Sequence, residues 1–141
     1  MEAISDGVRA RIALEKHGFR FQRTLGQYFL LDDARVARIV ALAGVGEADD
    51  VLEIGPGAGV LTCALARRAR RVVALEIDRA LAPVLAEMLS GVSNVRLEFA
   101  DALKADLAAL MGGRFAVVAN LPYYITADMV MKLLKSGLDI S

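Results

Sequence analysis

The sequence contains little of what several classes of protein require. One of its 141 residues is cysteine, Cys63, so the chain cannot form an internal disulfide. Seventeen basic residues balance 17 acidic ones, and any nucleic-acid partner would therefore be met through local patches rather than a global field. We find no repeat of fixed period and no low-complexity tract. These absences indicate one globular unit.

Long apolar runs are also missing. The longest uncharged runs, 54–66 and 115–127, are shorter than the roughly 18 apolar residues of a spanning helix, and both contain glycine or proline. The first residues include Glu2, Asp6 and Arg9, where a secretory signal needs an apolar stretch. We therefore expect a cytoplasmic protein with no membrane partner. Its 56% hydrophobic residues still supply a sizeable core, which excludes a disordered chain.

Apolar periodicity predicts an α/β fold. Asp6 is expected to cap a helix over 7–16, and Asp32 a second helix that ends before Gly44. From Asp50 onward, short apolar runs alternate with helix-period segments, which is typical of parallel strands joined by crossover helices. The expected strands are 51–54, 72–76, 94–99 and 115–119, and the expected helices among them are 60–69, a segment from Asp78, and 127–135. An open sheet of this kind binds ligands beyond the carboxyl ends of its strands.

The first strand end carries a glycine turn, residues 53–59, with the sequence Glu-Ile-Gly-Pro-Gly-Ala-Gly. Its glycines let the backbone turn tightly and approach a ligand before the next helix presents its free N–H groups. Glu76 closes the second strand about 20 residues further on, where a carboxylate can accept hydrogen bonds from ribose hydroxyls. Together the glycine turn and Glu76 favour a nucleotide-type ligand. The alternatives are that residues 53–59 form a plain turn and that Glu76 is a solvated strand end. The G-x-G-x-G spacing is shorter than the dinucleotide fingerprint, which disfavours NAD.

The third strand ends at Asp101. Its carboxylate is suited either to bond an exocyclic amine of a bound adenine or to cap a helix from residue 102. Spacing alone leaves these two interpretations even.

The fourth strand end carries the groups for chemistry on an aromatic amine. The side-chain oxygen of Asn120 and the carbonyl of Leu121 can each accept one amine hydrogen, which favours a more nucleophilic, tetrahedral nitrogen. Pro122 restrains the carbonyl before it, and Tyr123 offers a face on which a base can stack. The alternative is an ordinary turn with Tyr123 packed in the core.

These motifs, together with the segment 25–30, Leu-Gly-Gln-Tyr-Phe-Leu, resemble the rRNA adenine N6-dimethyltransferase family, specifically its small-subunit branch. The resemblance extends from about Gln22 to the last residue. It implies a Rossmann-like class I methyltransferase fold, S-adenosyl-L-methionine as methyl donor, and no metal. It further implies dimethylation of two adjacent adenines in small-subunit rRNA, within a pre-ribosomal particle.

The resemblance also implies roles for individual residues. The implied donor contacts are Tyr28 and Leu30 in the N-terminal motif, Gly55 and Gly57 against the methionine and ribose part, Glu76 on the ribose hydroxyls, Asp101 on the adenine amine, and Asn120. The implied catalytic residues are Asn120 between donor and target, and Leu121, Pro122 and Tyr123 around the target base. Tyr28 departs from the pattern, because the family usually has Asn, and sometimes His, at this position.

The resemblance predicts two parts of the chain, a basic N-terminal extension over 1–24 and a donor-binding domain over 25–141. In the family the fold continues with three further strands and a helical RNA-binding domain. We therefore expect a domain truncated after the fourth strand and its helix, with little activity alone, and a monomer at full length. The alternatives are a donor-binding module without turnover, an NAD-dependent oxidoreductase, and a large-subunit rRNA methyltransferase of the antibiotic-resistance branch.

Basic residues form two clusters. The first cluster precedes the N-terminal motif at residues 25–30 and consists of Arg9, Arg11, Lys16, Arg20 and Arg23. Its side chains either contact RNA phosphates or form a solvated surface, and the sequence favours neither interpretation. The second, Arg67, Arg68, Arg70 and Arg71, falls at a helix end, where complementing the helix dipole is the favoured interpretation. Cys63 is expected to be buried without a catalytic part, and no partner is predicted for His17.

Overall fold

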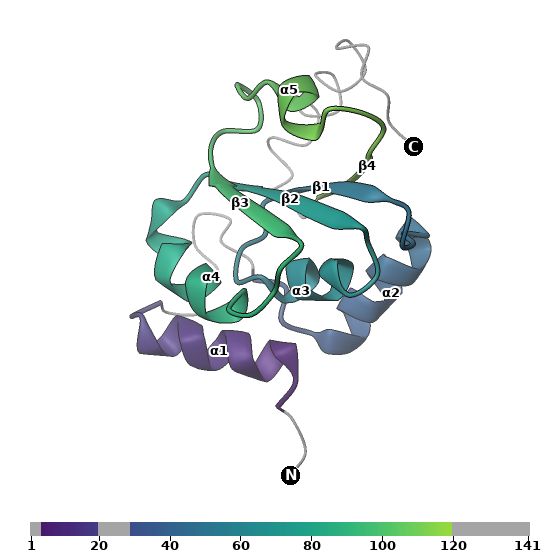
Figure 1. The fold of residues 1–141 in the computed structure, drawn as a ribbon. Helices are drawn as coiled ribbons and strands as arrows, with labels where there is room; N and C mark the ends of the chain where they lie inside the picture. The colour runs from purple at the N-terminus through teal and green to yellow at the C-terminus, as the bar shows by residue number, and fades with distance from the viewer. Residues whose placement is uncertain (1–3, 20–28, 120–141) are drawn as a thin grey trace.

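The computed structural model describes residues 4–19 and 29–119, which form a parallel sheet with helices on both faces (Figure 1). In chain order the strands are β1 (Asp50–Ile54), β2 (Arg71–Glu76), β3 (Val95–Phe99) and β4 (Ala116–Ala119). They lie in the order β3-β2-β1-β4, and every neighbouring pair is parallel. This arrangement confirms the expected α/β fold, and all expected strand limits agree to within one residue.

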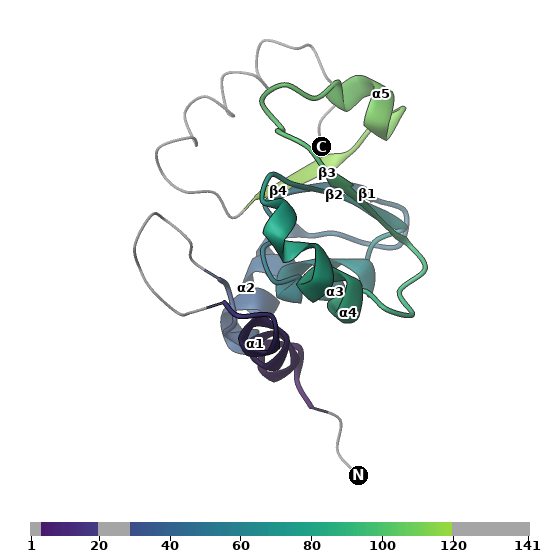
Figure 2. The ribbon, with the colours of Figure 1, turned by 90° about the vertical axis from the view of Figure 1, so that its left-hand side faces the viewer.

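The helices cover the sheet unequally. They are α1 (Asp6–Lys16), α2 (Asp33–Ala43), α3 (Val60–Ala66), the 3-10 turn η2 (Arg79–Leu81) leading into α4 (Ala82–Met88), and α5 (Leu107–Met111). Figures 1 and 2 show α2, α3 and α4 on one face, α1 beneath them, and α5 on the opposite face. No helix within the described ranges is long and apolar enough to cross a membrane. The helix expected over 127–135 lies outside the described residues.

The core is divided by the sheet into two apolar clusters. Val51 and Val72 belong to the cluster that α1 to α4 cover, whereas their neighbours Leu52 and Val73 belong to the cluster under α5 and Phe115. Every residue of β1 is buried. A parallel strand covered on both faces is buried along its length and favours apolar residues, which explains why the largely apolar run 51–54 located β1.

The start of α1 corrects one expectation. Ser5, rather than Asp6, is the N-cap, and its hydroxyl accepts a hydrogen bond from the Val8 amide at 3.2 Å. Asp6 instead lies in the first helical turn, where its buried carboxylate binds two arginines, Arg9 at 2.9 Å and Arg67 at 2.7 Å. The second helix begins as predicted, with Asp32 accepting from the Ala34 and Arg35 amides.

The arginine cluster after α3 also differs from expectation. The helix ends at Ala66, three residues before the predicted limit, so Arg70 and Arg71 lie beyond it and do not complement its dipole. Both bind Asp50 at the start of β1, with Arg70 Nη2 and Arg71 Nε at 2.6 and 3.0 Å from Asp50 Oδ2. Arg67, at the C-cap of α3, binds Asp6. These arginines therefore neutralise specific buried carboxylates.

The end of α1 is tied to α4 by a contact that the sequence did not indicate. His17 Nε2 and Lys16 Nζ lie 3.0 and 2.7 Å from Glu87 Oε1. His17 thus has a partner from a helix about seventy residues along the chain, which no local pattern reveals. Cys63 is buried in α3, as expected.

Candidate functional site

The candidate site begins where β1 runs into the glycine turn. Gly55, Gly57 and Gly59 have φ of 76°, 57° and 89°, a left-handed region that side chains with a Cβ rarely adopt. The Gly55 amide donates to the Leu75 carbonyl at 2.9 Å, which joins the turn to β2. At Gly59, an added Cβ would lie 3.2 Å from Leu85 Cδ2, so this glycine also permits close packing of α3 against α4.

Glu76 holds this turn from the end of β2. Its Oε1 accepts from the Gly57 amide and its Oε2 from the Asp78 amide, each at 3.0 Å. The side chain is 6% exposed, so the alternative of a solvated strand end is wrong. A carboxylate offers about four acceptor sites, and two backbone amides leave room for two more donors. Glu76 is therefore able to accept hydrogen bonds from a diol while it fixes the turn.

Glu53 is a site residue that the sequence analysis quoted without giving it a role. It is the one acidic side chain inside the apolar run of β1, and the Thr62 hydroxyl of α3 donates to its Oε1. Its side chain is 1% exposed. Burial raises the pKa of Glu53 to about 7, against the lowering effect of the Thr62 hydrogen bond and with a further rise from the charge of Glu76. A carboxyl group in an otherwise apolar strand is the signal that would have found it.

The end of β3 completes this edge of the sheet. The Ala100 amide donates to the Glu76 carbonyl at 2.9 Å, which places Asp101 next to the end of β2. Asp101 Oδ1 accepts from the Leu103 amide at 2.9 Å, and residues 102–105 form turns rather than the helix that its capping role required. The next helix is α5, whose cap is Asp106. Asp101 thus ends a strand at the edge where Glu76 lies, with its side chain half-buried.

Ile77 is a second residue that the sequence analysis missed. It follows Glu76 directly and is 69% exposed, one of the few large apolar side chains in the described residues with that exposure. An exposed apolar side chain beside a polar strand end offers a surface for a flat ring. Its position between two acidic residues, Glu76 and Asp78, is the sequence signal for such a surface.

The structure also brings part of the N-terminal motif to the glycine turn. A Cβ added to Gly57 would lie 3.5 Å from Phe29 Cδ1, so the two segments touch although 28 residues separate them. Leu30 is half-buried and packs against the core cluster under α1 to α4. Tyr28, Asn120, Leu121, Pro122 and Tyr123 lie outside the described residues, so their roles stay predictions.

The electrostatics of this edge suit a ligand that donates hydrogen bonds or carries positive charge. Within residues 4–19 and 29–119, Glu53, Glu76 and Asp101 form no ion pair with an arginine, lysine or histidine. No three histidine, cysteine or acidic side chains gather there in a way that would hold a metal ion. The edge therefore combines negative charge, free acceptors, an apolar surface and an approachable backbone.

Solved structures define the class of protein to which this fold belongs. The chain is similar to the 23S rRNA methyltransferase ErmE, with a TM-score of 0.72 and 42% identity over 80% of this chain and 45% of that one. It is also similar to a dimethyladenosine transferase from Plasmodium falciparum, with a TM-score of 0.64 and 31% identity over 76% of this chain and 38% of that one. The N-methyltransferase NodS from Bradyrhizobium japonicum WM9, in complex with S-adenosyl-L-homocysteine, shares the fold at 15% identity and a TM-score of 0.52, covering 77% and 54% of the two chains. The fold is that of the Rossmann-like methyltransferases.

Sequence comparison gives the family. The model of the family described as ribosomal RNA adenine dimethylase matches residues 18–141, and the chain belongs to that family. Proteins named ribosomal RNA small subunit methyltransferase A are similar to it: that of Ligilactobacillus salivarius is 49% identical over 96% of this chain and 48% of its own length. That of Bacillus licheniformis is 47% identical over 97% of this chain and 49% of its own length. The chain spans about half the length of these curated relatives.

Proposed function

We propose that the chain binds S-adenosyl-L-methionine at the carboxyl edge of the sheet and belongs to an enzyme that dimethylates adenine N6 in small-subunit rRNA. The observation that carries the proposal is the pair of hydrogen bonds that the Glu76 carboxylate accepts from the Gly57 and Asp78 amides. A buried carboxylate fixes the glycine turn through Gly57, keeps acceptor sites for two hydroxyls, and stands beside Ile77 and Asp101. This set matches a ribose, a flat base and the amine on that base.

The residues present fit each part of the donor. Gly55 and Gly57 let the methionine and ribose part approach the backbone, Glu76 accepts from the ribose hydroxyls, and Asp101 accepts from the adenine amine. Ile77 covers one face of the adenine ring. Leu30 lies in the motif that reaches the glycine turn and contacts the donor through its backbone, and Tyr28 borders the methionine end.

The target base is assigned to the segment after β4. Asn120, through its side-chain oxygen, and the Leu121 carbonyl each accept one hydrogen of the adenine amine, while Pro122 and Tyr123 hold the ring. The donor supplies an electrophilic methyl group on a sulfonium, and the adenine nitrogen that receives this methyl loses its surplus proton to solvent. The chain contributes position and electrostatics, so no general base is needed.

Sequence identity favours the small-subunit branch over the large-subunit branch. The curated relatives named for the small subunit reach 49% identity over 96% of this chain, whereas ErmE, named for 23S rRNA, is 42% identical over 80%. We further propose that the rRNA substrate lies within a pre-ribosomal particle and that the full-length protein is a cytoplasmic monomer. Residues 1–24 then form a basic extension and 25–141 the donor-binding part of a longer enzyme.

A second candidate is a module that binds the donor without turnover. It is favoured because the described site residues, Gly57, Glu76 and Asp101, all belong to the proposed donor site. Titration calorimetry with S-adenosyl-L-methionine, followed by incorporation of labelled methyl into small ribosomal subunits, separates the two. Binding without incorporation by this chain supports the module for residues 1–141.

Asn120→Ala tests the enzyme in a protein of the relatives' length that contains this sequence. We expect loss of methyl incorporation with donor binding largely retained, because Asn120 acts mainly on the target amine. Unchanged methylation of small-subunit rRNA would refute the enzymatic assignment, and binding of NAD in place of the donor would refute the ligand.

A further inference from the structure

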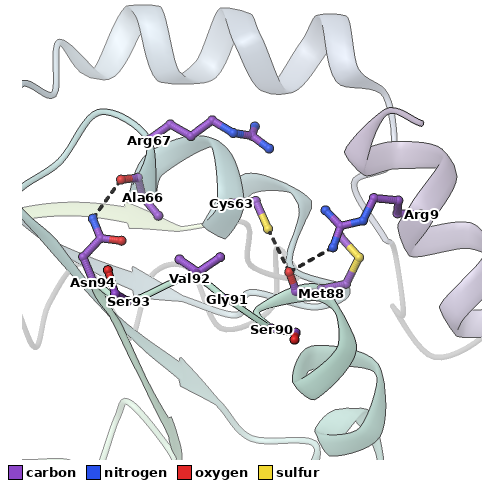
Figure 3. Close-up of a pocket in the computed structure, with 10 residues that line it drawn as sticks. All are labelled: Arg9, Cys63, Ala66, Arg67, Met88, Ser90, Gly91, Val92, Ser93 and Asn94. Carbon is purple, nitrogen blue, oxygen red and sulfur yellow. Dashed lines mark hydrogen bonds between the residues drawn. The ribbon is translucent and has the colours of Figure 1, made fainter. Parts of the chain in front are cut away.

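A pocket of about 280 Å³ lies away from the candidate donor site, near the amino ends of the strands. It is an open pocket bordered by α1, the ends of α3 and α4, and the loop 90–94 that leads into β3 (Figure 3). Ten residues line it, of which two are arginines, Arg9 and Arg67, and none is acidic. The fold thus joins one arginine from each of the two basic clusters of the sequence.

The two guanidinium groups are held in place before any ligand arrives. Arg9 Nη1 and Arg67 Nη1 bind the two oxygens of Asp6 at 2.9 and 2.7 Å, and Arg9 Nη2 donates to the Met88 carbonyl at 3.3 Å. Figure 3 shows the Arg67 side chain above Cys63 and the Arg9 guanidinium group beside the Met88 carbonyl. Asp6, Arg9 and Arg67 together carry a charge of +1, and the carboxylate of Asp33 also acts on Arg67. Each guanidinium has five N–H donors, and most of them remain for a ligand.

The other walls of the pocket suit a small anion with an attached sugar. Ser90 and Ser93 contribute hydroxyl groups, and Val92 contributes apolar surface. Asn94 Nδ2 donates to the Ala66 and Ala69 carbonyls at 2.8 and 3.2 Å, which fixes the loop against α3. Pockets for drug-sized ligands usually occupy about 300–1,000 Å³, so this one is too small for a second complete cofactor. It has the size for a phosphate group and part of its ribose.

We propose that this pocket binds a backbone phosphate of RNA through Arg9 and Arg67. The inference rests on the proposed function, since that function supplies an RNA partner. A phosphate accepts hydrogen bonds only, and guanidinium groups are the side chains best matched to its geometry. Such a contact fixes the position of the protein on RNA without reading its sequence. It therefore adds an anchoring point at the edge of the sheet opposite to the methyl-transfer site.

The test compares three forms of the chain in binding to a short single-stranded RNA across a series of salt concentrations. Arg67→Gln removes one phosphate contact, so we expect RNA binding about fivefold to tenfold weaker at 0.1 M salt. The slope of log affinity against log salt concentration should become shallower by about one. Arg68→Gln is the matched control, because it removes the same charge from the neighbouring exposed position outside the pocket. It should leave both quantities nearly unchanged.

Thermal melts fix a temperature at which every variant is folded. Equal losses of RNA affinity in Arg67→Gln and Arg68→Gln would overturn the proposal.

Two further measurements are needed. One distinguishes RNA from free phosphate as the ligand of the pocket, and the other distinguishes failure of the phosphate site from failure of the proposed donor-binding function. Inorganic phosphate should shift the amide resonances of residues 90–94 only weakly, whereas RNA should shift them at far lower concentration; the reverse order would assign the pocket to free phosphate and overturn the RNA site. Donor binding should be the same in the parent chain and in Arg67→Gln. A parent chain that binds RNA through Arg67 but never binds S-adenosyl-L-methionine would refute the proposed function and leave the phosphate site standing.

Discussion

The two edges of the sheet treat buried carboxylates in opposite ways. Near the amino edge, Asp6 and Asp50 each bind two arginines. At the carboxyl edge, Glu53 and Glu76 are as deeply buried, yet among the described residues they bind a hydroxyl and backbone amides. Burial leaves a carboxylate costly unless it is compensated, so the two edges solve the same problem with different partners.

The difference appears in the pKa values. The Arg70 hydrogen bond, opposed by burial and assisted by Arg71, lowers the pKa of Asp50 below its ordinary value. Burial raises the pKa of Asp6, but the hydrogen bonds and charges of the two arginines outweigh it and lower that pKa overall. Burial instead raises the pKa of Glu53 to about 7. Carboxylates paired with arginine hold the fold together, whereas those held by neutral donors keep acceptor capacity for a ligand.

The largest effect that we expect from the difference between the two edges is the contribution of Glu53 to the pH dependence of the free energy of unfolding. Its pKa is about 7 in the folded chain and ordinarily 4.5, so the folded state keeps a proton that the unfolded chain releases between these values. The stabilising contribution is complete below pH 4.5 and is lost as the pH rises to 7, by about 3 kcal/mol. Urea denaturation at several pH values should show that loss reduced in Glu53→Gln. Glu47→Gln, at an exposed position, is the control, and identical slopes in the two variants would contradict the raised pKa.

At the amino edge, Asp50→Asn should lower the free energy of unfolding at neutral pH by about 2 kcal/mol. The reason is that Arg70 and Arg71 lose their common partner, although both reach water and recover part of the loss. Because the pKa of Asp50 is lowered, its contribution is present above the ordinary value of 3.8 and is lost as the pH falls below it. Urea denaturation checks both statements. Acid sensitivity equal to that of the parent chain would show that this pair does not act as described.

Backbone conformation gives the next effect. Gly59→Ala should cost about 2 kcal/mol, because the new Cβ meets Leu85 and Met88 at 3.2 and 3.4 Å while φ is 89°. Gly112→Ala isolates the conformational part, since φ there is 72° with nothing within 4 Å of the added Cβ, and it should cost about 1 kcal/mol. Thermal denaturation of both variants measures the difference. Equal costs would mean that packing at the turn contributes nothing.

The smallest effect is expected at an exposed ion pair. Glu87 binds Lys16 and His17, and these partners lower its pKa, but the group lies in solvent. Glu87→Gln should therefore leave the melting temperature almost unchanged at physiological salt. If Glu87→Gln lowered the melting temperature as much as Asp50→Asn, burial would not explain the difference between the exposed ion pairs of Glu87 and the buried ion pairs of Asp50.

The sequence located the strands and the glycine turn because β1 and β2 are largely apolar runs bounded by turns. Glu76 and Asp101 were found because strand ends in a parallel sheet meet at one edge. The partners of Asp6, Asp50 and His17 could not be found this way, since each contact joins segments far apart in the chain. A helix after Asp101 was anticipated only as an alternative that began at residue 102, because the five residues of α5 are too few to show a period that would place its start.

The site was predicted in part for similar reasons. Glu53 and Ile77 were passed over because each sits inside a motif whose other members were easier to interpret. Their sequence signals are a carboxyl group in an apolar strand and an apolar residue between two acidic ones. These signals do not give the exposure, 1% for Glu53 and 69% for Ile77, on which the significance of each residue depends.

The most direct test of the contrast between the edges is the affinity of three proteins for S-adenosyl-L-methionine by titration calorimetry: the parent chain, Glu76→Gln and Asp50→Asn. Hydrogen bonds to a charged acceptor are worth about 1.5–3 kcal/mol, so Glu76→Gln should bind the donor about tenfold to a hundredfold more weakly. Asp50→Asn should bind like the parent chain wherever it is folded. Parent-like affinity in Glu76→Gln, or an equal loss in Asp50→Asn, would contradict the assignment of the carboxyl edge to the donor.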